Sequence, residues 1–221
     1  MERVEKSFSR SSSNYEQEAF LQNEISKKLL NEISGNFKNV LDLGCGTGFI
    51  CKNREFTFEN FLGIDISPNM LELHPKSDNC KTEISDFDSF SDFQNFDLII
   101  SSSSLQWSKN LKAIFEKFEN LDSAIHLAIF TNRTFIELQN ELEIVSPIPA
   151  LAEILNFAKN FSYRVEKGVL EFSSSKELLE YIRKSGVSGG WNLSKIGKLK
   201  KMLNRDEVKK LSFEIVYLQK S

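Results

Sequence analysis

Three glycines at alternate positions form the part of the sequence whose spacing points most directly to ligand binding. Gly44, Gly46 and Gly48 follow a short apolar segment, at a point where the backbone has to turn sharply and a ligand has to approach the main chain. Asp42 stands just before the turn, and Asp65 follows Gly48 by seventeen residues. In nucleotide-binding folds where a glycine-rich turn follows the first strand of a parallel sheet, a carboxylate at the end of the second strand accepts hydrogen bonds from ribose hydroxyls. The group therefore predicts a pocket for a ligand that contains a nucleoside.

The same turn distinguishes between two classes of nucleoside ligand. Nicotinamide dinucleotide sites use the spacing GxGxxG, which this chain lacks. Asp65 also disfavours a 2′-phosphorylated nucleotide through like-charge repulsion, although a helix cap or a surface charge is the alternative role for this residue. The string Asp-Leu-Gly-Cys-Gly-Thr-Gly, from Asp42 to Gly48, resembles the first motif of class I S-adenosylmethionine (SAM)-dependent methyltransferases. In that context Asp42 is placed to attract the cationic methionine part of SAM.

The resemblance implies a set of residues that contact SAM. Asp86-Phe87, after the third expected strand, matches the family position that contacts the adenine ring and its amino group. Tyr15 and Gln22 lie on one face of a helix that folds over the cofactor in related enzymes, so we expect a lid with Tyr15 near the methionine end. The alternative for Tyr15 is a core aromatic residue of an ordinary helix. The full expected set is Tyr15, Gln22, Asp42, Gly44, Cys45, Gly46, Gly48, Asp65, Ile66, Met70, Asp86, Phe87 and Ser102.

Strands and helices alternate through residue 130, which predicts a doubly wound α/β sheet. Strands are predicted near 38–43, 60–65, 80–84, 96–101, 124–130, 168–173 and 211–218, and those at 96–101 and 124–130 are apolar runs typical of buried strands. Helices are predicted at 15–34, 109–119, 134–143, 148–159 and 175–184, after Ser67-Pro68, and as a very short helical or irregular stretch after the glycine turn. With the methyltransferase resemblance, this order implies a Rossmann-like sheet of seven mostly parallel strands, with an antiparallel last strand and a small helical insertion after the fifth.

The bulk composition suits one methyltransferase domain over residues 1–221, with 40% hydrophobic and 27% charged residues. The expected parts are a lid helix region at 1–36, a SAM-binding core at 37–131, a helical insertion on the substrate side at 132–166, and a completion of the sheet at 167–221. No apolar run approaches the ~20 residues that span a bilayer, and the charged N-terminus is unlike a signal peptide. We therefore expect a cytoplasmic protein without membrane contact. Three cysteines without a CxxC pair and two histidines predict neither a disulfide framework nor a metal site.

Three segments outside the glycine turn narrow the class of methyltransferase. They are Ser-Phe-Ser-Arg-Ser-Ser-Ser-Asn-Tyr-Glu-Gln-Glu-Ala-Phe-Leu-Gln at 7–22, Ser-Leu-Gln-Trp-Ser at 104–108 and Phe-Thr-Asn-Arg-Thr-Phe-Ile-Glu-Leu at 130–138. Together they resemble the BioC family, the malonyl-acyl-carrier-protein O-methyltransferases of early biotin synthesis, over nearly the whole chain. The chain departs from that family in having Ser11-Ser12 for the usual Ala-Ala and a very short stretch between the glycine turn and the second strand. Its acidity argues against a nucleic-acid partner.

The resemblance implies that the enzyme converts the free carboxylate of a malonyl thioester into a methyl ester. Such a nucleophile is already ionised at neutral pH, so no general base is required, and the scarcity of histidine suits this chemistry. Arginine is the side chain best suited to hold a carboxylate, because its planar fork binds both oxygens. The candidates are Arg10, Arg133 and Arg164, of which Arg133 is favoured; its alternative is a surface arginine.

The segment after the fourth strand supplies the remaining residues expected on the substrate side. Gln106 and Trp107 follow that strand at the edge of the sheet where ligands gather. We expect Trp107 to form a wall of the acceptor pocket, with a core position as the alternative. The serine run at 101–104 has no His/Asp pattern that would make a nucleophile, so small side chains beside a methyl channel are its expected role.

A basic segment suggests how the substrate is delivered. Between Lys176 and Lys210, ten Lys or Arg stand against four Asp or Glu, in a chain of net charge −3. We expect the part from Lys195 to Lys210 to dock an acidic acyl carrier protein that carries the malonyl group; a solvated helix face is the alternative. The protein is expected to be a monomer. Two other functions stay open: methylation of a free small carboxylic acid, resembling the trans-aconitate enzymes, and SAM binding without catalysis.

Overall fold

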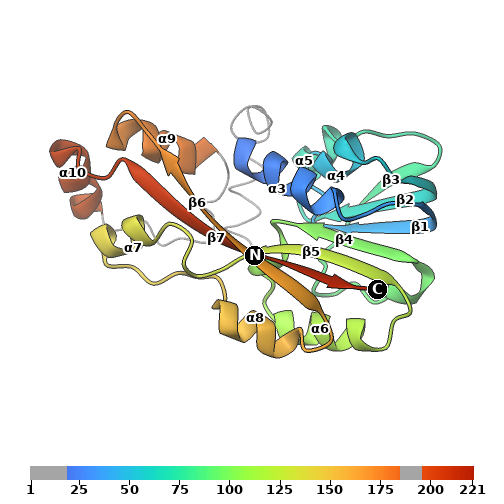
Figure 1. The fold of residues 1–221 in the computed structure, drawn as a ribbon. Helices are drawn as coiled ribbons and strands as arrows, with labels where there is room; N and C mark the ends of the chain where they lie inside the picture. The colour runs from blue at the N-terminus through green and yellow to red at the C-terminus, as the bar shows by residue number, and fades with distance from the viewer. Residues whose placement is uncertain (1–18, 185–195) are drawn as a thin grey trace.

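The structure, a computed structural model, describes residues 19–184 and 196–221 around a seven-stranded sheet (Figure 1). The strands are β1 (Asn36–Leu43), β2 (Thr57–Asp65), β3 (Cys80–Ile84), β4 (Leu98–Ser102), β5 (Ala124–Phe130), β6 (Ser162–Glu171) and β7 (Lys210–Lys220). They follow the order β3-β2-β1-β4-β5-β7-β6, and β7 runs antiparallel to both of its neighbours. The prediction of a doubly wound, mostly parallel sheet with an antiparallel last strand is confirmed.

Helices cover both faces of the sheet, because its central strands are apolar on both sides. One face packs against α3 (Phe20–Leu30) and α4 (Phe49–Asn53), and the other against α6 (Leu111–Glu119) and α8 (Leu151–Phe157) (Figure 1). A further short helix, α5 (Pro68–Glu72), follows β2 as expected. An apolar stripe with helical spacing on α3 and just after it is buried against the sheet: Leu21, Ile25, Leu29 and Ile33.

Beyond one end of the sheet, the β6–β7 hairpin continues and carries three helices (Figure 1). They are α7 (Ile136–Leu142), α9 (Ser175–Lys184) and α10 (Ile196–Arg205). This part, called the helical lobe below, has an apolar cluster separate from the two that lie between the sheet and its covering helices. The buried members of that cluster are Phe135, Leu138, Leu142, Leu178, Ile182, Met202 and Leu211.

Two elements differ most from the prediction, while the others agree with it to within about four residues at the described ends. β6 begins at Ser162, six residues before the predicted start, because an edge strand is exposed on both faces here and lacks the buried alternation that marks a strand. α10 is not among the predicted helices, because its four basic residues hide the few apolar positions that carry the helical spacing. α3 is described from Phe20, so the earlier part of the predicted helix lies outside the described residues. Within residues 19–184 and 196–221, no helix has both the length and the apolar character that crossing a bilayer requires.

Candidate functional site

A cleft opens where β1, β2 and β4 reach their carboxyl ends, the position where ligands bind in open α/β sheets. It encloses about 780 Å³, including the part open to solvent. We call it the central cleft. Its lining residues are Gln22, Ser26, Asp42, Gly44, Cys45, Gly46, Thr47, Phe49, Ile50, Asp65, Ile66, Met70, Phe87, Ser102, Ser103, Ser104 and Trp107.

The cleft brings together most of the site residues predicted from the sequence: Gln22, Asp42, Gly44, Cys45, Gly46, Asp65, Ile66, Met70, Phe87, Ser102 and Trp107. Four predicted residues are not among its lining, namely Gly48, Asp86, Gln106 and Arg133. Tyr15 lies outside the described residues.

Ser103 and Ser104 of the lining belong to the serine run expected beside a methyl channel. Four other lining residues were not predicted, namely Ser26, Thr47, Phe49 and Ile50. Ser26 had a signal in its spacing, since it follows Gln22 by one helical turn, and Thr47 had one in its place between two glycines.

The glycine turn has a backbone that other residues would not adopt. Gly44 has φ +71°, and a Cβ there would lie 2.4 Å from Ser104 Cβ. Gly48 has φ +86°, and its Cβ would lie 2.6 Å from Pro75 Cδ. Gly46, with φ +53°, faces open space in the cleft. The turn therefore leaves main-chain surface bare for a ligand and excludes side chains where the chain folds back on itself.

Two carboxylates stand at the ends of the neighbouring strands β1 and β2. Asp42 is buried, and this burial, followed by the charge of Asp65, raises its pKa well above the ordinary value. Asp65 accepts the N–H groups of Gly46 (3.0 Å) and Ser67 (2.8 Å). Burial also raises the pKa of Asp65, while these N–H groups act in the opposite direction. A positively charged ligand would offset both the lost hydration and the mutual repulsion of the two carboxylates.

Buried polar atoms without a partner point to the same kind of ligand. Among the described residues of the cleft they are Gln22 Oε1, Asp42 Oδ2, Thr47 Oγ1, Ser102 Oγ and Ser103 Oγ. A buried polar group left unpaired costs about 1–3 kcal/mol, so such a set calls for a bound partner. Amide and carboxylate oxygens accept from an ammonium group, and hydroxyls donate to a carboxylate. Over the described chain, no group of three or more His, Cys, Asp or Glu is arranged to hold a metal ion.

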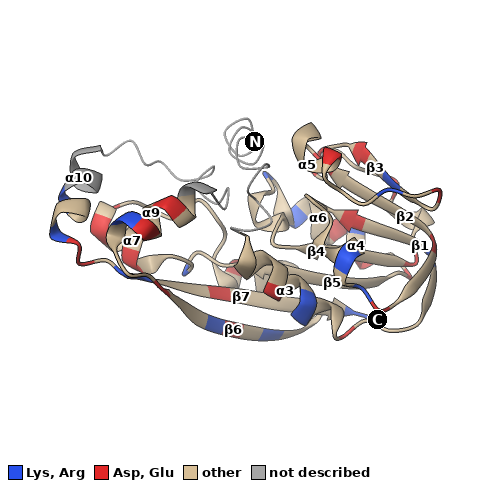
Figure 2. Ribbon diagram, turned by 90° about the horizontal axis from the view of Figure 1, so that it is seen from above, with Lys and Arg blue, Asp and Glu red and all other residues tan. Residues whose placement is uncertain are grey.

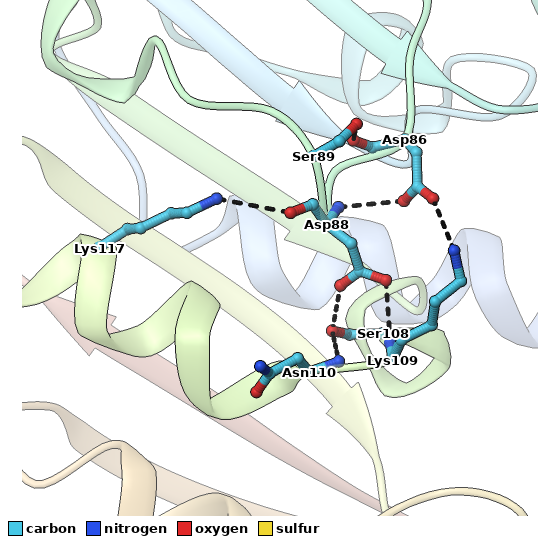
Figure 3. Close-up of polar contacts among 7 residues, drawn as sticks. All are labelled: Asp86, Asp88, Ser89, Ser108, Lys109, Asn110 and Lys117. Atoms are coloured by element: carbon cyan, nitrogen blue, oxygen red, sulfur yellow. Dashed lines mark hydrogen bonds and ion pairs between the residues drawn. The ribbon is translucent and has the colours of Figure 1, made fainter.

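The two residues of the Asp86-Phe87 pair have different surroundings. Phe87 is buried and lines the cleft. Asp86 is not part of the lining, because its Oδ1 accepts the N–H of Asp88 at 3.0 Å and its Oδ2 lies 3.2 Å from Lys109 Nζ (Figure 3). An apolar ring contact at Phe87 is thus available to a ligand, and a contact between Asp86 and an adenine amino group stays a prediction.

Trp107 ends the short 3₁₀ helix η3 (Leu105–Trp107) that follows β4. Its side chain lines the central cleft and packs against both the core on the α3 face and the cluster of the helical lobe. Gln106 beside it is buried, and its Nε2 donates to Ser103 O. Trp107 therefore separates the central cleft from the helical lobe.

The two candidate arginines that the structure describes, Arg133 and Arg164, are not found in the lining of the cleft. Arg10 lies outside the described residues. The Arg133 side chain is 71% exposed, and its Nε lies 4.0 Å from Oε2 of the buried Glu214. Arg164 stacks on the ring of Tyr217, with its guanidinium carbon 3.6 Å from the ring centre. The role of an arginine in holding an acceptor stays a prediction.

In the part expected to dock the carrier, Lys195 to Lys210, the side chains are described from Lys201 onward. Lys209 and Lys210 form exposed ion pairs with neighbouring carboxylates. Lys201 and Arg205 are exposed on α10, with no ion pair to a described residue. Figure 2 shows basic residues on α10, at the far end of the helical lobe.

Comparison with protein families places these features in a wider group. A family described as a methyltransferase domain matches residues 35–185, more than half of the chain. Malonyl-[acyl-carrier protein] O-methyltransferase 1 of Ilyobacter polytropus is 29% identical over 156 residues, which cover 66% of this chain and 58% of that relative. The chain spans between 54% and 63% of the length of three such curated relatives.

Solved structures share the fold. The YcgJ protein from Bacillus subtilis has a TM-score of 0.61 and 14% identity, with 90% of this chain and 96% of that chain covered. Phosphoethanolamine N-methyltransferase 2 of Haemonchus contortus, in complex with phosphomonomethylethanolamine and S-adenosylhomocysteine, has a TM-score of 0.52 and 17% identity, with 90% of this chain and 52% of that chain covered.

Proposed function

We propose, from the premise that this chain belongs to the methyltransferase-domain family, that it methylates the free carboxylate of a malonyl thioester on an acyl carrier protein, early in biotin synthesis. The chain is a class I methyltransferase that resembles the BioC family and uses SAM, as its glycine-turn motif predicted. Relatives named malonyl-[acyl-carrier protein] O-methyltransferase support the choice of acceptor.

The observation that carries this proposal is the chemistry of the cleft's described lining. It contains no histidine, lysine or arginine, and its titratable side chains are Asp42, Asp65 and Cys45. The two carboxylates stand at the glycine turn. Burial, with Asp42 and Asp65 nearby, raises the pKa of the Cys45 thiol well above its ordinary value, so it is not a base at neutral pH. An acceptor carboxylate, already ionised, needs no base, whereas an alcohol has to lose a proton.

The residues of the central cleft fit SAM. The unpaired Gln22 Oε1 and Asp42 Oδ2 suit its ammonium group, and Thr47 and Ser102 offer hydroxyls for its carboxylate. Each Asp65 oxygen accepts one backbone N–H and keeps a lone pair for ribose hydroxyls. When bound, SAM supplies the electrophile, which is a methyl group carried on a positively charged sulfur.

The chain's own contribution to the reaction is alignment and exclusion of water. The side chains at the end of β4, residues 102–104, are all serine, which leaves room for an acceptor oxygen to approach in line with the leaving group. Trp107 closes the side of the cleft toward the helical lobe and keeps water from the reacting atoms. Such positioning, rather than proton transfer, is the main barrier-lowering effect available here.

The helical lobe and Arg133 are assigned to the acceptor. Lys201 and Arg205 expose positive charge on α10, which suits docking of an acidic carrier protein. Arg133 lies between the end of β5 and the start of α7. Its contact with Glu214, at 4.0 Å, is long enough to be exchanged for a carboxylate of the substrate. We therefore assign Arg133 to the malonyl carboxylate.

The test is methyl transfer from labelled SAM to malonyl-acyl carrier protein, malonyl-coenzyme A and free dicarboxylic acids, assayed side by side. Labelling of the malonyl thioesters, with a base-labile methyl ester as product, is expected. Labelling of a free acid alone would assign the protein to enzymes resembling the trans-aconitate methyltransferases. Tight binding of S-adenosylhomocysteine with no label on any acceptor would favour a SAM-binding protein without catalysis.

A further inference from the structure

Two walls of the central cleft come from loops that are joined by polar contacts between residues next to the walls (Figure 3). One wall is the loop after β3, where Phe87 lines the cleft; the other is the segment after β4 that ends in Trp107. Asp88 belongs to the first loop. Its N–H donates to Asp86 Oδ1 at 3.0 Å, which closes a tight turn around Phe87 and fixes the direction of that side chain.

The carboxylate of Asp88 reaches the second wall. It accepts the hydroxyl of Ser108 and the N–H of Lys109, the latter at 2.9 Å. These two residues directly follow Trp107. The Ser108 hydroxyl oxygen also accepts the N–H of Asn110 at 3.1 Å, at the start of α6. The backbone that directly follows Trp107 is thus fixed by the carboxylate of Asp88.

Two lysines complete the connection between the loops. Lys109 Nζ lies 3.2 Å from Asp86 Oδ2, so Lys109 contacts the first loop through both its backbone and its side chain. Lys117, on α6, donates to Phe90 O at 2.8 Å and to Asp88 O at 3.5 Å. The N–H, the carbonyl and both carboxylate oxygens of Asp88 are therefore all engaged (Figure 3).

We propose that Asp88 is a positioning residue that couples the two substrate sites: it makes the Phe87 wall and the Trp107 wall a single unit, so that occupancy of the cofactor side sets the position of Trp107 on the acceptor side. The residue touches neither substrate. Its effect passes through the turn around Phe87 in one direction and through Ser108 and Lys109 in the other. This coupling needs only the SAM site, so it can be tested without knowledge of the acceptor.

The test uses the fluorescence of Trp107 in the full chain with Trp191→Phe, which removes the other tryptophan. S-adenosylhomocysteine is expected to change the emission of Trp107 and its quenching by acrylamide. Asp88→Asn keeps the shape of the side chain but gives up one of its two acceptor oxygens. We expect it to weaken S-adenosylhomocysteine binding by about three- to tenfold, the range for one ordinary lost hydrogen bond, and to abolish the Trp107 response at saturation.

Asp97→Asn is the matched control. Asp97 also joins two chain segments, because its carboxylate accepts the N–H groups of Lys38 (2.8 Å) and Asn39 (2.7 Å), at the opposite edge of the sheet. It should lower thermal stability without changing the Trp107 response. If Asp88→Asn keeps a full Trp107 response at saturating S-adenosylhomocysteine, or if the two variants behave alike, Asp88 is merely structural and the proposal is wrong.

Ser108→Ala separates the arms of the contact, because it removes only the hydroxyl. A partial loss of the Trp107 response is expected, and in the double variant Asp88→Asn/Ser108→Ala the losses should not add, because both act on one contact. Fully additive losses would contradict the proposed route. In a turnover assay with any accepted substrate, Asp88→Asn should raise KM for both SAM and acceptor, and an effect confined to kcat would also overturn it.

Discussion

The central cleft and the helical lobe are held together in different ways. In the cleft the backbone is constrained, since Gly44 and Gly48 have positive φ and no room for a Cβ, and the buried Asp42 stands beside them. In the lobe, cohesion comes from seven buried apolar side chains packed between three helices and the end of the β6–β7 hairpin. A defect in the cleft should therefore appear as lost ligand affinity, and a defect in the lobe as lost stability.

The strongest test of this difference is Gly44→Ala. A Cβ at this position would lie 2.4 Å from Ser104 Cβ, and the residue would have to keep φ +71°. We expect affinity for S-adenosylhomocysteine to fall at least ~100-fold, because the strain of a left-handed L-residue is roughly 1–2 kcal/mol and the clash adds to it. Isothermal titration calorimetry measures the change.

Gly35→Ala provides the comparison for strain alone. Gly35 also has positive φ, +112°, but a Cβ there meets nothing within 4 Å, and the residue does not line the cleft. This variant should lose stability and keep its affinity. If Gly44→Ala retained affinity within threefold of the parent, the turn would not be the rigid element described above.

The second test breaks the lobe instead. Leu178 of α9 is fully buried in the lobe cluster, so Leu178→Ala should lower the free energy of unfolding by about 2–5 kcal/mol. Binding of S-adenosylhomocysteine should stay within about twofold below the unfolding transition, because the cleft does not use this residue. Urea unfolding and calorimetry give the two numbers.

Leu203→Ala, on the exposed side of α10, is the control for the lobe. Leu203 is 39% exposed, so its truncation should cost well under half as much as that of Leu178. A loss of cofactor affinity in Leu178→Ala equal to its loss of stability would mean that cleft and lobe are not separate units.

The difference between the backbone-constrained cleft and the apolar packing of the lobe also explains which features could be predicted from the sequence. The cleft follows from local rules, because glycine is needed at positive φ and carboxylates at strand ends leave a recognisable spacing, as at Asp42, Gly44 and Asp65. The sheet follows for a similar reason, since each buried strand is an apolar run. Trp107 was also predictable as a wall from its place after β4.

The lobe and the loop contacts were harder to predict because they depend on residues far apart in the chain. Met202 of α10 packs in the same cluster as Leu178. α10 was nevertheless not predicted, because its lysines obscure the helical spacing of its apolar residues. Asp86 pairs with Lys109, twenty-three residues away, and no local pattern indicates that contact. The position of Arg133 beside Glu214 likewise depends on how β7 inserts next to β5.

The third test concerns charge within the cleft. Because burial raises the pKa of Asp42, the ligand-free protein binds a proton there at a higher pH than an exposed carboxyl group would, and a cationic ligand favours release of that proton. SAM affinity should therefore rise as pH rises toward and through this raised pKa, and fall as pH falls. Asp42→Asn should remove this dependence and weaken SAM by about tenfold, roughly the effect of one charge-assisted hydrogen bond. S-adenosylhomocysteine keeps the ammonium group that is assigned to Asp42, so it is expected to lose about as much affinity as SAM.

The stability of the ligand-free protein gives an independent check on Asp42. A carboxyl group whose pKa is higher in the folded than in the unfolded state favours folding below its unfolded pKa, and this contribution disappears as pH rises through the folded value. Thermal unfolding should accordingly show a decline on the alkaline side of about pH 4 that is smaller in Asp42→Asn. Identical pH profiles for the two proteins would place the raised pKa elsewhere.

The smallest expected effect belongs to the outer surface of the lobe. Lys201 and Arg205 are exposed on α10. The double charge reversal Lys201→Glu/Arg205→Glu should raise KM for malonyl-acyl carrier protein by roughly two- to fivefold at low salt. The effect is modest because exposed charges attract a partner but are screened by salt. The rise should shrink with added salt and be absent for malonyl-coenzyme A, which lacks the protein surface. Lys112→Glu, in an exposed pair with Glu116 on α6, is the control for the single lobe variant Lys201→Glu, because both change the net charge by the same amount. α6 covers the sheet face away from α3 and takes no part in the lobe. If the lobe variant and the control changed KM equally, or if neither changed it at low salt, the lobe would supply stability to the acceptor side without being the surface that receives the carrier.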